Sequence, residues 1–304
     1  MKDSLESLAG KKLLILGGPV QALKVVLEAQ KQGIYTIVTD LVPKSEAKSA
    51  ADLALSYSVM DSESLIDWCR NNPVDGVLNF NIDFAQHSHQ KICEYFGFPC
   101  YGTEEQYDYF TDKRKFKQLC IAYDVGVIPE FSSDNPEEMR FPMLVKPAES
   151  SSSRGAAICC NPTELSGAIA YAKESTRNKE VIIEQYMGGF PDVELAYFVN
   201  KGEPYLIYAG DRILGKKEYG LDQQCVCFVS PTKYLHSILD SVHPKICRML
   251  KQIGLKNGPV FFQGFLDGEI VRLYDPGIRF PGDEFISIVK EITGVDFVRA
   301  MIKY

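Results

Sequence analysis

The chain has 304 residues, of which 45% are hydrophobic and 24% charged, with a formal net charge of −7 and a pI near 5.3. This composition is typical of a globular protein, and the length predicts two or three packed units. The acidic balance, without a basic tail or a lysine and arginine cluster, argues against a nucleic-acid or membrane partner. The sequence shows neither a signal-peptide pattern nor about 20 consecutive apolar residues, so we expect a cytoplasmic protein.

The first hundred residues alternate apolar strands with amphipathic helices. KKLLILGG and IYTIVTD have strand patterns, and PVQALKVVLEAQKQG between them has a helix pattern that ends at Gly33. The alternation continues to FPCYG, which we expect to be a last short strand. Apolar strands separated by helices predict a parallel sheet covered on both faces. Residues 1–104 are therefore expected to form an α/β, Rossmann-like domain.

The turn after the first strand disfavours a nicotinamide dinucleotide. Gly17 and Gly18 follow this strand and Asp40 closes the second one, as in a dehydrogenase. The turn LGGPVQALK, however, lacks the glycines of G-x-G-x-x-G that approach a pyrophosphate. A glycine-tipped turn at a sheet edge still suits a small anionic substrate.

The pattern changes after residue 104. A helix pattern opening at Thr111 or Asp112 precedes the strand patterns FPMLVKPA, RGAAICC, VIIEQYM, VELAYFVN and EPYLIYAG, with one clear helix, PTELSGAIAYAKEST, among them. Strands in succession predict α+β structure with antiparallel sheets. Two further strands meet at Asp267-Gly268, a dipeptide typical of hairpins.

The nine cysteines show no metal-site spacing. Cys159 and Cys160 are adjacent, Cys225 and Cys227 are separated by a single residue, and no C-x-x-C or zinc-type cysteine and histidine spacing occurs. Buried reduced thiols are therefore favoured over metal or redox chemistry.

The stretch VKPAESSSSRGAA, residues 145–157, joins a lysine to a loop of small residues. Lys146 ends an apolar strand, where a buried charge requires an anionic partner, and a phosphate would supply one. The serines that follow offer backbone N–H groups and hydroxyls to phosphate oxygens, with Arg154 and Gly155 closing the loop. A solvated linker is the alternative, although apolar strands flank the segment on both sides.

Further polar residues lie on the later strands. Glu184 ends VIIEQYM, and Asp192 and Glu194 follow after a glycine turn; a strand edge can contact adenine, and a nearby carboxylate can accept from ribose hydroxyls. Taken singly, these acids would be solvated loop residues. Gln263 and Asp275 lie 12 residues apart around the hairpin turn, so we expect them nearly opposite each other on one face. Such oxygen ligands suit Mg²⁺, and the alternative is a buried polar pair.

These features, in this order, resemble the ATP-grasp superfamily. They are the βαβ domain, a helix opening with DK, VKP before a small-residue loop with RG, a strand ending in Glu184, and Q…YDPGIRFPG. The resemblance covers nearly the whole chain and is nearest to carbamoyl-phosphate synthetase large-subunit-like and purine-biosynthesis carboxylase-like members. It implies ATP and Mg²⁺, with Mn²⁺ as an alternative, bound between two antiparallel sheets. It also implies an ADP-forming ligase that joins a small carboxylate to an amine or ammonia through an acyl phosphate.

The resemblance further implies three units. They are an N-terminal domain over 1–104, a small ATP-grasp subdomain with the phosphate loop over 105–190, and a large subdomain over 191–304 that we expect to be truncated at its C-terminus. The implied partners are the two small-molecule substrates, and a homodimer is a family-level expectation.

By position, the resemblance assigns roles to individual residues. Lys113 and Lys146 correspond to lysines that contact the phosphates, and Arg279 and Lys146 to catalytic groups. The loop over the phosphates comprises Ser150, Ser151, Ser152, Ser153, Arg154 and Gly155. The adenine-contacting segment comprises Glu184, Gln185, Tyr186 and Met187, and the ribose acceptor is Asp192 or Glu194. The metal ligands are Gln263 and Asp275. The candidates for the substrate carboxylate are Gly17, Gly18, Gln21 and Asp83.

Three departures distinguish this chain from the family pattern. Asp275 replaces the usual glutamate and Gly277 the usual asparagine of the metal motif, the phosphate loop is rich in serine, and the chain stops at VDFVRAMIKY, a helix that runs on in relatives. These departures bear on turnover more than on nucleotide binding. The alternative function is a nucleotide-binding regulatory or scaffold protein, descended from such ligases, with little or no catalysis.

Overall fold

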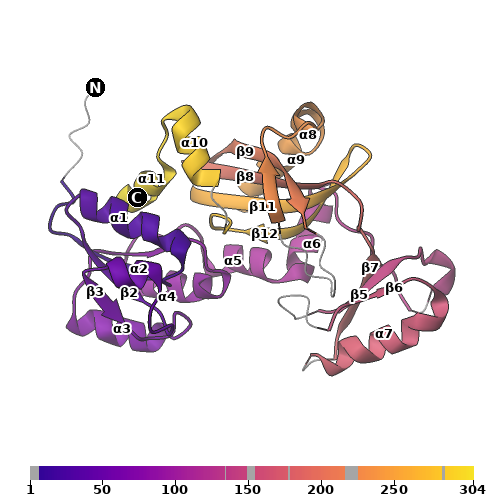
Figure 1. The fold of residues 1–304 in the computed structure, drawn as a ribbon, viewed down its shortest axis with the longest axis horizontal. Coiled ribbons are helices and arrows are strands. Elements are labelled where there is room, and N and C mark those ends of the chain that lie inside the picture. The colour runs from indigo at the N-terminus through magenta and orange to yellow at the C-terminus, as the bar shows by residue number, and fades with distance from the viewer. Residues whose placement is uncertain (1–6, 134, 149–154, 177–178, 216–224, 283–284) are drawn as a thin grey trace.

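Three sheets follow one another along the chain. The computed structural model describes residues 7–133, 135–148, 155–176, 179–215, 225–282 and 285–304. Figure 1 shows an N-terminal α/β unit at one end of the long axis and a small sheet at the other, with a large sheet between them. No helix within the described ranges combines the length and the apolar character that a membrane crossing requires.

The N-terminal unit is a four-stranded parallel sheet with the order β3-β2-β1-β4. Its strands are β1 (Lys12–Leu16), β2 (Tyr35–Thr39), β3 (Leu53–Leu55) and β4 (Gly76–Asn79). Its helices are η1 (Val20–Ala22), α1 (Leu23–Lys31), α2 (Glu46–Ala50), α3 (Ser62–Asn71), η2 (Asp83–Ala85) and α4 (Gln86–Phe96). Alternate residues of β1 enter two different cores, Leu13 and Ile15 on one face and Leu14 and Leu16 on the other. Both faces of the sheet are covered, which confirms the predicted α/β architecture.

Two helices lead out of this unit, α5 (Glu104–Thr111) and α6 (Lys113–Ala122). Asp112 caps α6, because its carboxylate accepts from two backbone N–H groups of the first turn at 2.8 and 3.1 Å. The segment FPCYG before α5 is irregular, so the predicted short strand is wrong. The reason is local: Phe98 N–H donates to the Cys93 carbonyl of the preceding helix at 2.8 Å, which turns the chain back along α4.

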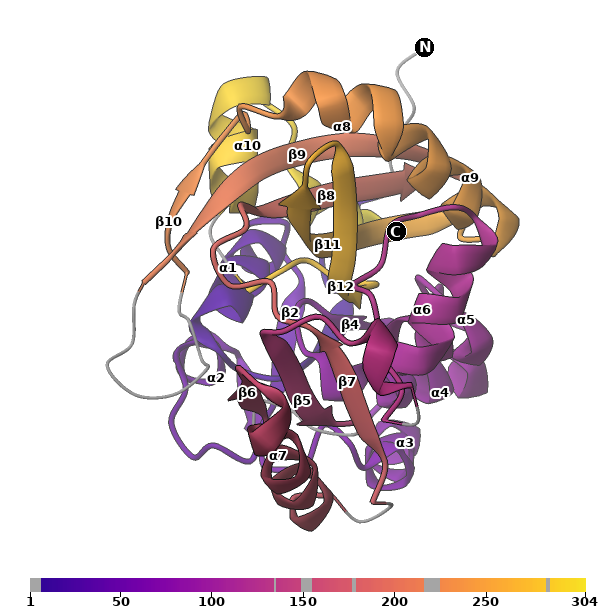
Figure 2. The ribbon, with the colours of Figure 1, turned by 90° about the vertical axis from the view of Figure 1, so that its right-hand side faces the viewer.

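The small sheet is antiparallel, with the order β6-β5-β7. Its elements are η3 (Pro136–Glu138), β5 (Met143–Pro147), β6 (Ala157–Cys159), α7 (Pro162–Glu174) and β7 (Val181–Gln185). Met143, Val145 and Cys159 point to a core of their own, which α7 completes with Ala168 and Ala172. Figure 2 views the molecule from this end.

The large sheet is also antiparallel, with the order β10-β9-β8-β11-β12, as the sequence predicts for this part of the chain. Its strands are β8 (Asp192–Asn200), β9 (Glu203–Leu214), β10 (Cys225–Val229), β11 (Asn257–Asp267) and β12 (Ile270–Gly277). The helices around it are α8 (Leu235–Ser241), α9 (His243–Gln252), α10 (Phe285–Thr293) and α11 (Phe297–Lys303). In Figure 2, α8 and α9 cover one face of this sheet.

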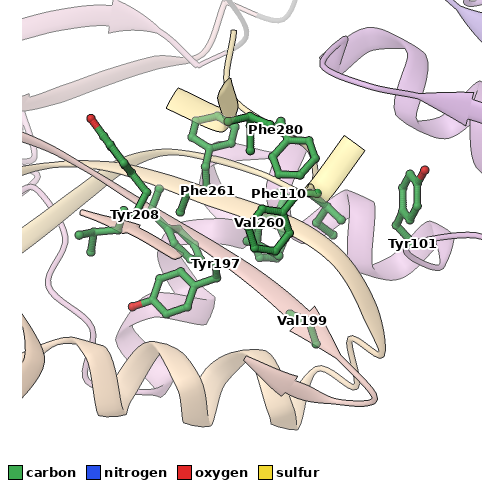
Figure 3. Close-up of a cluster of buried hydrophobic side chains, with 14 of the residues drawn as sticks. Tyr101, Phe110, Tyr197, Val199, Tyr208, Val260, Phe261 and Phe280 are labelled. Carbon is green, nitrogen blue, oxygen red and sulfur yellow. The ribbon is translucent and has the colours of Figure 1, made fainter. Parts of the chain in front are cut away.

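One hydrophobic core joins the N-terminal unit to the large sheet. Figure 3 shows part of this core, where Tyr197 and Val260 of the large sheet lie near Phe110 of α5 and Phe280 beyond β12. The chain then returns, and α11 packs against α1 (Figure 1). The small sheet has a core that is separate from this one. The site described below lies between the small sheet and the large sheet.

The unit boundaries and the burial of the cysteines are the two remaining sequence expectations about the fold. The division of the chain at residues 104 and 190 remains a prediction, and α5 and α6 contribute Phe110 and Phe116 to the core of the large sheet. The interpretation of the cysteines as buried thiols is wrong for Cys160 and Cys227, which are exposed, although all nine cysteines are free.

Candidate active site

A small pocket opens between the small sheet and the β12 edge of the large sheet. Its volume is about 40 Å³, and its walls come from α6, β5, β7, β12 and the segment that precedes the small sheet. That segment bridges both sheets, because Val127 pairs with Leu273 and Glu130 pairs with Glu184. The lining combines apolar and charged side chains, namely Phe116, Val127, Ile128, Ile182, Leu273, Tyr274, Lys113, Lys117, Glu130, Lys146 and Glu184. Such a lining suits a ligand with an apolar part and a charged part.

Lys146 and Glu184 form an ion pair across β5 and β7 inside this pocket. Lys146 Nζ lies 2.5 Å from Glu184 Oε1, and the two side chains are 20% and 8% exposed. In the strand register Leu144 lies opposite Glu184, so Lys146 reaches its partner along the diagonal. The anionic partner that the burial of Lys146 requires is therefore Glu184, where the sequence predicts a phosphate.

Lys113, the first residue of α6, carries a second positive charge to the same pocket. Burial lowers the pKa of Lys113, and the charge of Lys146 lowers it further, whereas Asp275 and Glu184 oppose this shift. The Lys113 side chain still has solvent contact, so it lies in an open cleft rather than in a closed core. The structure thus brings together the two lysines that the sequence assigns to phosphate binding.

Two backbone N–H groups in the segment after Glu184 already donate to carbonyl groups of the protein. Gln185 N–H donates to the Pro129 carbonyl at 2.9 Å, and Tyr186 N–H donates to the Pro142 carbonyl at 3.1 Å. The Met187 side chain is buried. An adenine contact from this segment would therefore involve its other backbone groups, such as the Gln185 carbonyl.

Asp192 and Glu194 lie on β8, so their interpretation as solvated loop residues is wrong. They are 4% and 0% exposed. Arg212 of β9 donates to the two Asp192 oxygens at 3.1 and 3.0 Å, and the Tyr274 hydroxyl donates to Asp192 at 3.0 Å. Burial raises the pKa of Asp192 to about 6, although Arg212 opposes the shift. A ribose hydroxyl at Asp192 would therefore compete with protein donors.

Gln263 and Asp275 lie directly opposite each other in the β11–β12 hairpin, as the sequence predicts. Gln263 Nε2 donates to Glu194 Oε2 at 2.8 Å, and its amide oxygen lies 3.4 Å from the Tyr274 hydroxyl. Burial among protein groups raises the pKa of Asp275, and the nearby Arg279 opposes the shift. The Asp275 side chain nevertheless keeps contact with solvent, and its charge acts on Lys113 of the pocket. Their role as metal ligands stays a prediction.

The position of the missing asparagine, Gly277, has no room for a side chain. A Cβ atom there would lie 2.3 Å from Phe261 Cε1 and 3.2 Å from Arg279 Cγ. The packing around Gly277 therefore excludes the asparagine that the family pattern has at this position.

Arg279 and Asp83 meet in a two-point ion pair. Arg279 Nε and NH2 both donate to the Asp83 carboxylate, the second at 2.6 Å, and NH1 donates to the Phe280 carbonyl at 2.9 Å. The guanidinium carbon also lies 4.6 Å above the Phe261 ring. The sequence resemblance assigns a catalytic role to Arg279 and a substrate-binding role to Asp83. In the structure, these two residues are paired with each other.

The turn after β1 lies at the carboxyl end of the parallel sheet. Gly17 has a φ of +88°, and a Cβ atom there would lie 2.0 Å from Ile82 Cδ1, so only glycine fits. Gly18 N–H donates to Asp40 Oδ2 at 2.7 Å, which occupies the carboxylate that a nicotinamide ribose would need. Gln21 Nε2 donates to the Gly282 carbonyl at 2.9 Å and so ties this turn to the segment after β12.

The predicted phosphate loop is described only at its end. Ser150, Ser151, Ser152, Ser153 and Arg154 lie outside the described residues. Gly155 has a φ of +75°, and a Cβ atom there would lie 2.3 Å from Ser175 Cβ. Glycine is therefore required where this segment enters β6.

Sequence reasoning missed Arg212 and Tyr274, which hold the polar network beneath the cleft. The Tyr274 hydroxyl lies 2.6 Å from Arg212 NH1 and also contacts Asp192 and Gln263. The signal was available for Arg212, because it interrupts the apolar strand EPYLIYAGDRIL as Lys146 interrupts its own. No pattern marks Tyr274, whose contacts come from three different strands.

Comparisons with known proteins agree with this architecture. The family model described as the D-ala D-ala ligase C-terminus matches residues 115–242. The formate-dependent phosphoribosylglycinamide formyltransferase of Wolinella succinogenes is 26% identical over 191 residues, which cover 58% of this chain and 48% of that protein. The chain thus spans about half the length of this curated relative.

Two solved structures share the fold over 96% of this chain. Phosphoribosylglycinamide synthetase from Anaerococcus prevotii has a TM-score of 0.77 and 19% identity, with 74% of its chain covered. The biotin carboxylase domain dimer of the Hydrogenobacter thermophilus 2-oxoglutarate carboxylase, in complex with MgADP, ADP and bicarbonate, has a TM-score of 0.79 and 18% identity, with 69% covered.

The chain thus has a parallel α/β unit followed by two antiparallel sheets, an architecture that these solved structures share. This architecture and the comparisons agree with the resemblance to the ATP-grasp superfamily that the sequence indicates.

Proposed function

We propose that this chain is an ATP- and Mg²⁺-dependent ligase that joins a small carboxylate to an amine or ammonia and releases ADP and phosphate. The observation that carries the proposal is that Lys113 and Lys146 line one pocket between the two antiparallel sheets, with Asp275 close enough for its charge to act on Lys113. Phosphoryl transfer needs positioned cations more than covalent chemistry from the protein, and this cleft offers two of them.

Each wall of the cleft has a proposed part in holding ATP. Leu273 and Ile182 supply apolar surface for the base beside the segment Glu184–Met187. Lys113 and Lys146 face the phosphates, over which the segment Ser150–Gly155 would close. The ribose hydroxyls lie toward Asp192 or, less favourably, the more deeply buried Glu194.

The donor set at the cleft floor fits Mg²⁺ with one strong protein ligand. Mg²⁺ commonly binds one or two carboxylates together with substrate phosphates and water, and the solvent-exposed Asp275 carboxylate is such a ligand. The Gln263 amide oxygen is the second candidate, and it lies 3.4 Å from the Tyr274 hydroxyl. Mg²⁺ held there would reduce the negative charge of the phosphates, and Mn²⁺ accepts the same ligands.

The substrate carboxylate is proposed to bind between the cleft and the carboxyl end of the parallel sheet, beside Gly17, Gly18, Gln21 and Asp83. In the described part of the chain, three buried polar atoms of segments that follow strands of this sheet have no hydrogen-bond partner, namely Ser45 Oγ, Asn81 Oδ1 and Gln86 Oε1. Ser45 Oγ lies beside Gly18. Unpaired buried polar atoms favour a polar ligand at this edge. The carboxylate would attack the terminal phosphate of ATP, and the amine would then displace phosphate from the resulting acyl phosphate.

Several broader statements belong to the same proposal. The relatives named above act on small molecules by their printed names, and one of them is a dimer with MgADP and bicarbonate. We therefore propose small-molecule substrates, a homodimer and a cytoplasmic location for this chain. We also propose that 1–104, 105–190 and 191–304 are its three structural units.

A nucleotide-binding regulatory or scaffold function is the second candidate. Two observations favour it: Arg279 is neutralised by Asp83, and Gln263 is engaged by Glu194 and Tyr274. In this case ATP would bind in the cleft without turnover.

ADP release is the experiment that separates the two candidates. Purified protein would be given Mg²⁺ and ATP with a panel of small carboxylates, each with and without ammonia or an amine. We expect ADP release that depends on one carboxylate, and its loss in Asp275→Asn but not in Glu269→Gln on the same hairpin, where the side chain is exposed. ATP binding without release under any combination would favour the regulatory function.

A further inference from the structure

Three potential metal ligands meet in the N-terminal unit, outside the cleft. They are His89 and Cys93 of α4 and Cys100 of the segment that follows, and their ligand atoms all lie within 4.8 Å of one another. His89 and Cys93 are buried and Cys100 is partly buried. None of the three has a role in the proposed ligase site.

Local backbone structure accounts for this meeting. His89 and Cys93 are four residues apart on α4, so they share one face of the helix. Gly97 ends the helix with a φ of +71°, a conformation that glycine adopts without strain, and Phe98 N–H bonds back to the Cys93 carbonyl at 2.8 Å. The reversed chain then carries Cys100 to the same face. The sequence spacing H-x3-C-x6-C hides this proximity, because it depends on the turn at Gly97.

The imidazole of His89 is already oriented as a metal ligand would be. Its Nε2 lies 3.1 Å from the Val77 carbonyl and donates to it, which leaves the Nδ1 lone pair facing Cys100 Sγ at 3.6 Å. Cys93 Sγ lies 3.5 Å from Nε2, and the ring stacks on Tyr101 with centroids 5.3 Å apart. Metal-bound histidines commonly donate their other ring N–H to a carbonyl in this way, which fixes the ring.

One measured spacing and the chemistry of the ligand set match a tetrahedral zinc centre. Zinc bonds of about 2.3 Å to sulfur and about 2.0 Å to nitrogen place tetrahedral ligand atoms about 3.5 to 3.8 Å apart. The 3.6 Å between His89 Nδ1 and Cys100 Sγ lies in that range. Two thiols and an imidazole favour zinc over Mg²⁺ or Ca²⁺, which prefer oxygen.

A fourth ligand can reach this cluster from two sides. Tyr107 Oη lies 3.8 Å from Cys100 Sγ. Cys100 also lines a pocket of about 340 Å³ together with Thr103 and Gln106, so solvent can approach its sulfur.

We propose that His89, Cys93 and Cys100 bind a zinc-type metal ion, with water or Tyr107 as the fourth ligand. The ion ties α4 to the segment that leads into α5 and so fixes the N-terminal unit against the rest of the protein. A thiolate is the form of cysteine that binds metal.

Metal content tests the proposal directly. The full chain would be purified under reducing conditions, stripped with a chelator, and titrated with Zn²⁺ and separately with Co²⁺. We expect one Zn²⁺ per chain, thiolate-to-cobalt charge-transfer absorption, and protection of two cysteines from a thiol reagent. Cys100→Ser should weaken zinc binding by more than the roughly 10- to 100-fold that loss of a supporting contact costs.

Two further variants keep the test independent of folding. His89→Gln retains an amide that can donate to the Val77 carbonyl but removes the imidazole, so it should fold and lose the cobalt spectrum. Cys69→Ser, at another buried cysteine of the same core, should keep zinc binding. Equal zinc binding by wild type and a folded Cys100→Ser variant would overturn the proposal. Formation of a Cys93–Cys100 disulfide that added zinc does not prevent would overturn it as well.

Discussion

Arg279 and Asp83, which are 196 residues apart in the sequence, form a two-point ion pair that fastens the segment after β12 to the N-terminal sheet. Only 10% of the Arg279 side chain is exposed, whereas 54% of the Asp83 side chain is. Asp83 is therefore the hydrogen-bonded anionic partner of this guanidinium, and the Asp275 charge also acts on it. Arg279 would therefore have to contact a transferring phosphoryl group either while it is paired with Asp83 or after this pair has separated.

Replacing Asp83 by asparagine should destabilise the protein. The change leaves a largely buried guanidinium without its anionic partner, so we expect the free energy of unfolding to fall by about 1–3 kcal/mol. Urea denaturation at neutral pH measures this change. Asp67→Asn is the matched control, because Asp67 pairs with Arg70 on the surface and such pairs contribute only about 0–1 kcal/mol. Equal changes in the free energy of unfolding would show that the Arg279–Asp83 pair stabilises the protein no more than a surface pair does.

Lys146→Ala should remove the stabilisation of the protein by ATP. Ligand at about 100 times its Kd adds ~2.7 kcal/mol to the stability of a protein that binds it only when folded. We expect this shift in the thermal unfolding of the wild type with Mg²⁺ and ATP, and its loss in the variant. Lys173→Ala, at an exposed position on α7, should keep the shift. The difference with and without ATP is the relevant quantity, since Lys146→Ala also leaves Glu184 buried without its partner. A full ATP shift in Lys146→Ala would remove this lysine from the nucleotide site.

Asp192 should make stability fall as the pH rises through about 6. Its pKa in the folded protein is raised to about 6 from an ordinary value of 3.8, so the folded state holds the proton more tightly than the unfolded state. The contribution of this group is therefore greatest below pH 4 and is lost as the pH rises through the folded-state pKa. The free energy of unfolding, measured from pH 4 to pH 7.5, should show this fall in the wild type and not in Asp192→Asn. Parallel curves for the two proteins would mean that Arg212 offsets the effect of burial.

Gly277→Ala should be destabilising, although alanine is small. Its Cβ would meet Phe261 Cε1 at 2.3 Å, and overpacking of this kind costs about 1–3 kcal/mol. Gly282→Ala provides the comparison, since a Cβ atom there has no neighbour within 4 Å among the described residues. Chemical denaturation of both variants checks the prediction. If Gly277→Ala were as stable as Gly282→Ala, packing would not explain why this chain lacks the asparagine of the family pattern.

The local elements could be predicted because their signals are local. The apolar run of β1, the cap at Asp112 and the turn at Asp267-Gly268 depend on residues within a few positions of one another. The turn brings Gln263 and Asp275 near each other, but its register alone would place Gln263 opposite Tyr274. A bulge between Gln263 and Gly264 shifts the partner of Gln263 to Asp275. The short strand at FPCYG failed, because the chain there bonds to the preceding helix.

The partners of charged side chains depend on contacts that sequence spacing does not reveal. Lys146 was a correct candidate for a buried charge, but only the register of β5 and β7 shows that Glu184 is its partner. Asp192 is buried because Arg212 and Tyr274 come from two other strands to hold it.

By itself, the sequence determined the order of the elements, the change from parallel to antiparallel sheets and the candidacy of Lys146 as a buried charge, since hydrophobic period and turn chemistry are properties of short segments. The tertiary structure alone decided that Arg279 is neutralised by Asp83, that Gly277 has no space for an asparagine, and that His89, Cys93 and Cys100 meet. The physical reason is that charge pairing, close packing and metal-type clusters depend on distances between residues that the folded chain brings together from separate segments.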